Sequence, residues 1–150
     1  GVFSMSPVVV RDASSCRPRF AARTAGGTFV RGGRRVPVRV LHESGGTDRT
    51  LATDVEIADG IVSQGLGLMF RRSVPDDYAL VFPFSGVSRR RLHMVCVPFD
   101  VDALWLVEGR VRKKKRLSAW TGHGHAEADT VVELPAGAAE DVLPGDTVRI

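Results

Sequence analysis

Few cysteines and the lack of a long apolar run exclude two common kinds of protein. The 150 residues include only two cysteines, Cys16 and Cys96, so a scaffold held by several disulfides is not expected. Cys96 lies in an apolar run and is expected to be a buried core residue. No apolar stretch approaches the roughly 18 residues that a membrane-spanning helix requires, and the apolar cluster at residues 8–10 is too short for a signal peptide. We therefore expect a soluble, cytoplasmic protein without a membrane span.

The motifs of several familiar functional classes are also missing. The chain has no Gly-x-Ser-x-Gly elbow, no phosphate-binding Walker loop, no paired Cys-x-x-Cys motifs and no Rossmann fingerprint. His123 and His125 form a His-x-His pair, but further His or Cys ligands do not follow nearby. We expect these two histidines to lie in a mobile surface loop, and we expect no metal site and no cofactor.

The basic charge of the chain is unevenly distributed. Of its 21 basic and 17 acidic residues, eight arginines and a single acid, Asp12, fall in residues 1–39. Residues 40–150 hold the remaining 13 basic and 16 acidic residues, so this part carries a formal charge of −3. The pI near 9.7 is therefore poor evidence for a polyanionic partner. Nucleic acid is accordingly an unlikely partner of the domain.

Two regions differ in pattern. Residues 1–37 are rich in Arg, Ser, Ala and Gly and show no sustained period of 2 or 3.6. They are expected to be a disordered basic tail or a spurious N-terminal extension, with a targeting segment or a functional basic arm as alternatives. Residues 38–150 contain enough apolar material for one hydrophobic core and are expected to form a single β-rich domain.

Alternating or short apolar runs predict about eight short strands in this domain. They fall near residues 36–40, 51–57, 78–84, 92–97, 101–107, 111–117, 130–134 and 147–150, and turn signals separate them. Residues 59–70 and 136–142 have the spacing of short, irregular helices. The pattern predicts a mainly β (α+β) fold, either a compact β-sandwich or an open barrel.

Four segments resemble one known family. In order, they are Gly67-Leu68-Met69-Phe70-Arg71; His93-Met94 followed by Pro98-Phe99-Asp100-Val101-Asp102; Ser118-Ala119-Trp120; and Val132-Glu133-Leu134-Pro135-Ala136-Gly137 with Pro144-Gly145-Asp146. Residues 48–150 thereby resemble the domain of unknown function 192 (DUF192) family, also called UPF0127, in a haloarchaeal-like branch. The resemblance implies a small β-rich domain. It implies no agreed reaction, cofactor or catalytic residue.

The leading hypothesis is a non-catalytic module that binds a small ligand or a protein, and that is a monomer. A shallow pocket is expected to have apolar walls and a few convergent polar groups, the usual make-up of a small-ligand site. The candidate residues are Met69, Phe70, Phe84, Met94 and Trp120 as walls, with Arg71, His93, Asp102 and Glu133 as polar groups.

Two alternatives stay open. The first is an enzyme that uses Asp102, Glu133 and His93 as acid and base groups. Asp102 is the foremost candidate because an acid between Val101 and Ala103 in an apolar strand is costly unless it is satisfied. The second is a nucleic-acid binder that uses the basic strand at residues 110–116, where six of seven residues are Lys or Arg.

Overall fold

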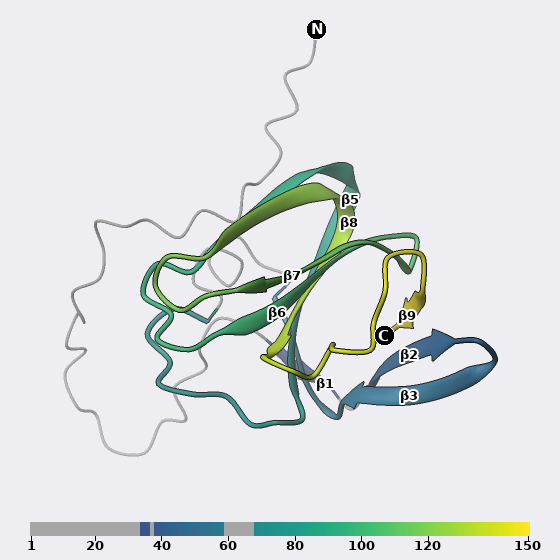
Figure 1. The fold of residues 1–150 in the computed structure, drawn as a ribbon, viewed down its shortest axis with the longest axis horizontal. Coiled ribbons are helices and arrows are strands. Elements are labelled where there is room, and N and C mark those ends of the chain that lie inside the picture. The colour runs from purple at the N-terminus through teal and green to yellow at the C-terminus, as the bar shows by residue number, and fades with distance from the viewer. Residues whose placement is uncertain (1–33, 37, 59–67) are drawn as a thin grey trace, which may run out of the picture.

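The computed structural model describes residues 34–36, 38–58 and 68–150, which form nine strands in one sheet (Figure 1). The strands are β1 (Arg34–Val36), β2 (Val40–Ser44), β3 (Thr47–Ala52), β4 (Asp54–Ile57), β5 (Tyr78–His93), β6 (Val101–Val107), β7 (Arg110–Leu117), β8 (His123–Pro135) and β9 (Thr147–Arg149). Their order is β1-β4-β5-β8-β6-β7-β9-β2-β3. β4 and β5 pair in parallel and the other pairs are antiparallel. The predicted mainly β class with an open-barrel or sandwich architecture is confirmed.

Two hairpins follow directly from local turn chemistry. Gly45 and Gly46 have φ values of 58° and 82° between β2 and β3. Glu108 and Gly109 have φ values of 50° and 76° between β6 and β7. Two successive residues with positive φ form the turn that matches the twist of antiparallel strands. Both turns occur where the sequence predicts them.

The two helical segments have different outcomes. Most of the predicted helix at residues 59–70 lies outside the described residues, as does nearly all of the segment at residues 1–37. Residues 136–142 form successive tight turns instead of an α-helix. Ala138 N donates to Pro135 O at 3.0 Å, and Val142 N donates to Ala139 O at 3.1 Å. Within the described ranges, no helix is long and apolar enough to cross a membrane.

β5 is one long strand where the sequence predicts two. It runs for 16 residues because its second half alternates between exposed and buried positions, with Arg91 outside and Leu92 inside. The predicted strand at residues 92–97 is wrong, since β5 ends at His93 and Val97 N then donates to Met94 O in a turn at 3.0 Å. Cys96 lies buried in this turn, as expected of a core residue. It is disulfide-bonded, however, and its partner lies outside the described residues.

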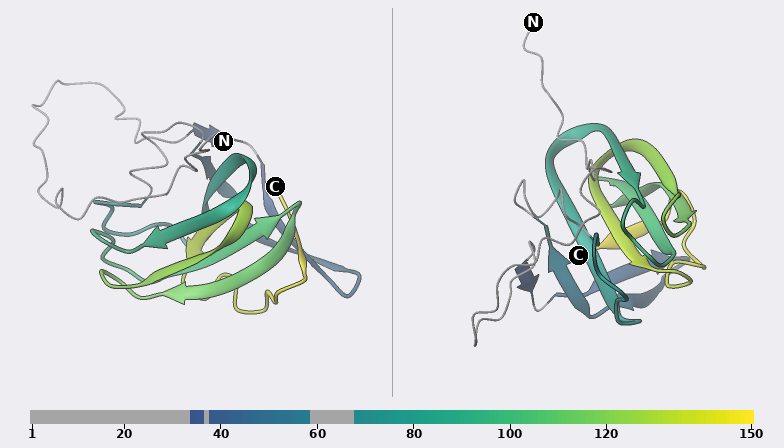
Figure 2. Two further views of the ribbon diagram at one scale, coloured as in Figure 1. Left: turned by 90° about the horizontal axis from the view of Figure 1, so that it is seen from above. Right: turned by 90° about the vertical axis from the view of Figure 1, so that its left-hand side faces the viewer.

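The paired strands β5 and β8 bend sharply and arch over β6 and β7 (Figures 1 and 2). A register shift between Pro83 and Ser88 divides the ladder into residues 80–83 with 130–133 and residues 88–93 with 123–128. We call the second part, residues 88–93 and 123–128, the arch. Trp105 of β6 lies beneath it, fully buried, and its Nε1 donates to Arg90 O at 3.0 Å.

The sheet packs against a hydrophobic core on each face, where the sequence led us to expect one core. The inner core lies under the arch and includes Phe82, Leu92 and Trp105. The outer core lies on the opposite face and includes Leu104 and Val132. β6 contributes to both because successive side chains of a strand point to opposite faces, and its first six residues are all buried.

Two lysines join the outer edge of β7 to the arch, where no strand ladder connects them. β7 pairs with β9 at Arg110 and, in the part of the chain that the structure describes, its outer edge has no further strand partner. Lys113 Nζ instead donates to His125 O at 3.0 Å, and Lys115 Nζ donates to His123 O at 2.8 Å. These bonds join the edge of β7 to the arch. This connection is made by side chains, so a prediction of strands from the sequence does not reveal it.

Candidate functional site: a cationic pocket on the arch

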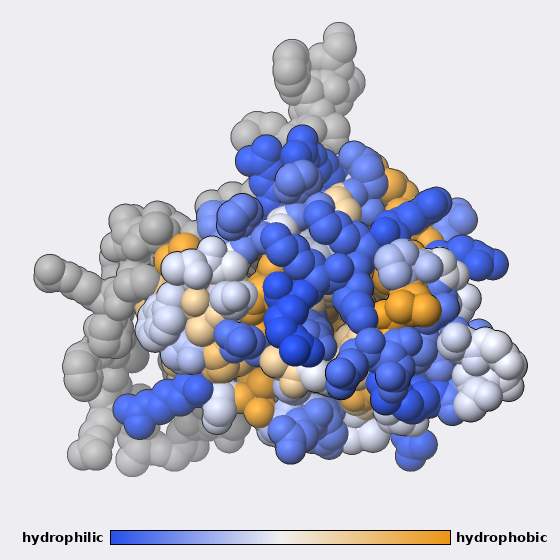
Figure 3. Space-filling model, in the orientation of Figure 1, coloured by the Kyte–Doolittle hydropathy of each residue, from blue (hydrophilic) through white to orange (hydrophobic). Residues whose placement is uncertain are grey.

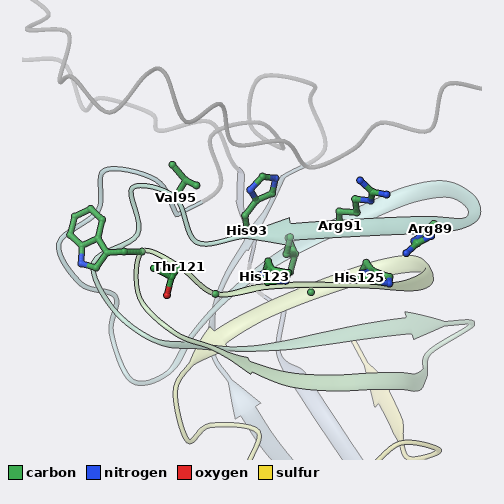
Figure 4. Close-up of a pocket in the computed structure, with 11 residues that line it drawn as sticks. Arg89, Arg91, His93, Val95, Thr121, His123 and His125 are labelled. Atoms are coloured by element: carbon green, nitrogen blue, oxygen red, sulfur yellow. The ribbon is translucent and has the colours of Figure 1, made fainter.

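A cavity of about 360 Å³ opens on the outer side of the arch (Figure 4). Its lining comes from the end of β5, the turn that follows, the segment before β8 and the start of β8. The charged and ionisable lining residues are Arg89, Arg91, His93, His123 and His125. We call this cavity the cationic pocket.

The register of the arch brings these side chains together. His93 lies directly opposite His123, and Arg91 lies directly opposite His125. Residues opposite each other in an antiparallel pair share a face, with Cβ atoms about 4.5–5.5 Å apart. Residues two apart on one strand share that face as well, so Arg89 joins the row of Arg91 and His93. Figure 4 shows the five side chains on the same side of the two strands.

The pocket is electrostatically suited to an anion. Its lining includes no acidic residue, and the nearest acid in the ladder is Glu127, which lies opposite Arg89. The pKa of His125 is lowered from its usual 6.5, first by the charge of Arg89 and then by partial burial and the charges of Lys113, Arg91 and His123. Nearby positive charges disfavour the charged form of the ring, so the causes that involve Arg89, Lys113 and Arg91 all have the sign expected beside cations. The described residues contain no group of three or more His, Cys, Asp or Glu side chains that could hold a metal ion.

A tight turn supports one end of the pocket. Gly122 N donates to Ser118 O at 2.8 Å, and a Cβ on Gly122 would lie 2.5 Å from the Ser118 nitrogen. Only glycine fits such an approach between backbone segments. Gly122 O in turn accepts a bond from Met94 N at 2.9 Å. The turn is therefore fastened to the end of β5 and presents Trp120, which lines the pocket and is 58% exposed.

A second polar cluster adjoins the inner core at Tyr78 and is largely buried. Arg71 Nη2 contacts both carboxylate oxygens of Glu56, at 2.9 and 3.0 Å. Its Nη1 donates to the Tyr78 hydroxyl at 3.0 Å, and that hydroxyl donates to Glu56 Oε2 at 2.9 Å. Burial raises the pKa of Tyr78 far above its usual range, with Glu56 and Glu133 adding to the rise while Arg71 opposes it. Tyr78 therefore stays protonated and completes a salt-bridged network that holds β4, β5 and the segment after residue 67 together.

Asp102 is satisfied entirely by its own fold. Its carboxylate accepts bonds from Arg116 Nε at 2.8 Å, Gly137 N at 2.9 Å and Ala139 N at 3.2 Å. It is 3% exposed and faces the outer core, because it lies opposite Leu134. Asp102 has the partners that its position demands, and it uses them to anchor the turns at residues 136–142.

The three acid–base candidates do not converge. Glu133 is fully buried and lies opposite Ala103, so it faces the inner core, whereas Asp102 faces the outer core. His93 lies at the far end of β5, on the outer side of the arch. Acid and base groups must reach one substrate to act on it, and these three point to different sides of the sheet.

The remaining candidates are also dispersed. His93 and Trp120 line the cationic pocket. Met94 is fully buried in the inner core, Phe84 packs against that core, and Met69 is 6% exposed. Phe70 is 38% exposed on the surface. Arg71 and Glu133 belong with Tyr78 in the closed interior. The structure brings two of the nine candidates to one open site.

The basic strand is largely occupied by internal contacts. Lys114 Nζ donates to the carbonyl oxygens of Ala139 at 3.1 Å and Glu140 at 2.8 Å. Arg116 pairs with Asp102, and the adjacent lysines of β7 bond to the arch. The four residues at positions 113–116 thus serve the fold, which weakens the basis for a nucleic-acid interface along β7.

The sequence predicts no anion site at Arg89, Arg91, His123 and His125, which the structure brings together. A signal was present, because Arg89, Arg91 and His93 recur at every second position, as do His123 and His125. His123 and His125 lie in β8 and not in a loop, so that expectation is corrected. The alternation predicts a shared site only once it is known that the two segments pair as neighbouring strands.

Comparisons with known proteins agree with this fold. A proposed transcription regulator from Sinorhizobium meliloti 1021 has a crystal structure that superposes with a TM-score of 0.66 at 25% identity, over 74% of this chain and 91% of that one. A protein of unknown function from Novosphingobium aromaticivorans DSM 12444 superposes with a TM-score of 0.68 at 21% identity, over 83% of this chain and 100% of that one. None of the curated proteins compared with the chain matches it.

The family is established by residues 41–150, which match the family model described as "Uncharacterized ACR, COG1430". That span holds all nine candidate residues and every residue of the cationic pocket. It also contains the strands from β3 to β9, which include the complete arch. The chain belongs to the DUF192 family.

Proposed function

We propose that this domain is a non-catalytic module that binds a small anionic ligand in the cationic pocket. One observation carries the proposal: two adjacent strands project Arg89, Arg91, His93, His123 and His125 to one side around a cavity that no acid lines. Arg89 lies opposite Glu127, so the row ends in an acid–base pair, whereas Arg91 lies opposite His125 and His93 lies opposite His123. These cationic and imidazole groups offer hydrogen-bond donors to an anion, and such bonds are stronger when one partner is charged.

The dispersal of the acid–base candidates favours binding over catalysis. Asp102 and Glu133 point to opposite faces of the sheet, and Asp102 is occupied by Arg116 and two backbone N–H groups. The name of the Sinorhizobium meliloti relative suggests a regulatory setting, in which a ligand-binding domain has a natural place. We also propose a monomer in the cytoplasm, from a haloarchaeal-like branch of the family.

The proposal is tested by titrating the full chain with inorganic phosphate and ribose 5-phosphate at constant ionic strength. Histidine ring signals in NMR spectra report binding at the pocket. Arg91→Gln is expected to weaken binding about tenfold, because hydrogen bonds to charged groups contribute roughly 1.5–3 kcal/mol. The signals of His93, His123 and His125 should respond before those of other residues.

Arg110→Gln is the matched control because it removes the same charge from an exposed site on β7. Arg110 Nη1 makes a long bond of 3.4 Å to Gly145 O. If Arg110→Gln and Arg91→Gln weaken phosphate binding equally, the attraction is a general effect of charge and the proposal is wrong. Absence of any histidine response to either probe would be equally decisive against it.

A further inference from the structure

Trp120 has an exposure that folding does not explain. It is 58% exposed, although burial of an aromatic side chain contributes much to stability. Its φ is 65°, a region that bulky residues rarely adopt. The chain's other tryptophan, Trp105, shows the usual behaviour, since it is fully buried and its Nε1 is hydrogen-bonded. The backbone of Trp120 is therefore strained, and burial of its side chain does little to offset the cost.

The strained conformation is held from two sides. Trp120 N donates to Val97 O at 2.9 Å, and Ala119 N donates to Asp100 Oδ1 at 2.8 Å. With the close approach of Gly122 to the chain at residue 118, these bonds leave the turn little freedom. Strained residues that the surroundings fix in this way are concentrated at ligand clamps and active sites. The turn fixes the backbone of Trp120 beside the cationic pocket, so the indole starts from a defined position in the lining.

The geometry points to a ligand that joins a flat ring to an anionic group, with the ring stacked on Trp120 and the anion among the cationic side chains. This inference rests on the proposed anion-binding function and narrows it to aryl and nucleoside phosphates or carboxylates. Trp120 and His123 are three residues apart and line the same cavity, and His123 faces His93 across the arch. Because these residues line one cavity, a ligand that fills it contacts both the ring surface and the histidine side chains.

The size of the cavity favours a small molecule over a polymer. Its volume of about 360 Å³ lies near the lower end of the range of small-ligand sites, roughly 300–1,000 Å³. The basic side chains at positions 113–116, which would extend the positive surface along β7, are bonded within the fold. A single ring with its attached anion is the better match.

The test uses tryptophan fluorescence, because Trp105 is fully buried and Trp120 is the exposed indole. The full chain is titrated with AMP, phenyl phosphate, ribose 5-phosphate and adenosine. AMP or phenyl phosphate should quench the fluorescence and bind at least about fivefold tighter than ribose 5-phosphate. The range expected for stacking on an aromatic side chain is about 5-fold to 150-fold. A preference for AMP would identify nucleotides, and a preference for phenyl phosphate would identify simpler aryl anions.

Trp120→Leu should abolish the preference for a ring and leave the affinity for ribose 5-phosphate unchanged. Trp120→Gly is a second variant, in which the ring is removed and the positive φ is relaxed. It serves if Trp120→Leu does not fold.

Several outcomes would overturn the inference. If ribose 5-phosphate binds as tightly as AMP and phenyl phosphate, or if both Trp120 variants keep the preference, the ring does not stack on this indole. The proposed anion site would then remain, but without a stacking site for a ring. If no phosphate binds, the proposed function fails together with the inference. A further contrary result would be that AMP does not bind while a single-stranded oligonucleotide does, with an affinity that grows with its length. The ligand of the pocket would then be a polymer and not a small molecule.

Discussion

Gly124 lies directly against Trp105: a Cβ atom on Gly124 would be 2.8 Å from Cη2 of the indole and 3.3 Å from Cζ2. The arch passes over the fully buried indole at a distance that only glycine allows. Gly124→Ala should therefore destabilise the protein by about 1–3 kcal/mol, because overpacking forces side chains or backbone to shift. Urea unfolding, followed by the fluorescence of the buried indole, measures the loss.

Gly86→Ala is the control for this substitution. Gly86 lies at the bend of β5, and a Cβ there would meet nothing within 4 Å. The change in unfolding free energy should be at most about 1 kcal/mol and of the stabilising sign, since the main effect is on the unfolded chain. Equal losses in the two variants would show that the contact between Gly124 and Trp105 is not the cause.

The buried pair of Glu56 and Arg71 should be far more important to stability than a surface pair. Their side chains are 6% and 11% exposed. Glu56→Gln leaves the guanidinium without a charged partner in the interior, which typically costs about 3–5 kcal/mol. Arg49→Gln, which breaks a pair with Asp141 in which both side chains are largely exposed, should cost less than about 1 kcal/mol. Comparable unfolding midpoints in urea for the two variants would contradict the closed network.

Asp102→Ala separates structure from binding. It removes the acceptor for Gly137 N and Ala139 N and the partner of Arg116. A stability loss of at least about 2 kcal/mol is expected, because buried donors without acceptors cost roughly 1–3 kcal/mol each. Phosphate affinity should not change in the folded variant, because Asp102 faces away from the arch. A fall in affinity equal to that of Arg91→Gln would restore Asp102 as a site residue.

The pKa of His125 responds to the positive charges around the pocket, above all to that of Arg89. It is lowered from 6.5, so the ring stays neutral to a lower pH than usual, and Arg89→Gln should raise it because Arg89 is the largest cause. A bound anion should raise it too, by favouring the charged ring. Anion affinity should therefore increase as the pH falls through the pKa of the bound state. NMR titration of the ring, with and without phosphate, measures both shifts. A pKa that Arg89→Gln leaves unchanged would contradict the role given to Arg89.

Local signals in the sequence account for much of the fold. The turns at Gly45-Gly46 and Glu108-Gly109 require positive φ, and glycine beside a polar residue marks them. β6 occupies residues 101–107, as its apolar run predicts. The need of Asp102 for partners also followed from physical chemistry alone. Its actual partners did not, because Gly137 and Ala139 are 35 and 37 residues away and approach only through the register of β6 and β8.

The site was harder to predict for the same reason. Arg91 and His125 are 34 positions apart in the sequence, and they meet only because β5 and β8 both bend at one register shift. No local pattern at residues 83–88 indicates that the chain bends there and then continues as the same strand. Candidates such as Met94 fit an apolar wall by composition, but the turn after β5 directs this residue into the inner core.

The lysine-lined edge of β7 also bears on how concentrated solutions of this protein behave. An unpaired strand edge is a template on which a second chain can add, and charged side chains are a common protection against this. An incoming strand along residues 112–117 would lie beside five consecutive cations, and it would have to displace ammonium groups already bonded to the arch. The side chains that join β7 to the arch therefore also protect this edge against edge-to-edge aggregation.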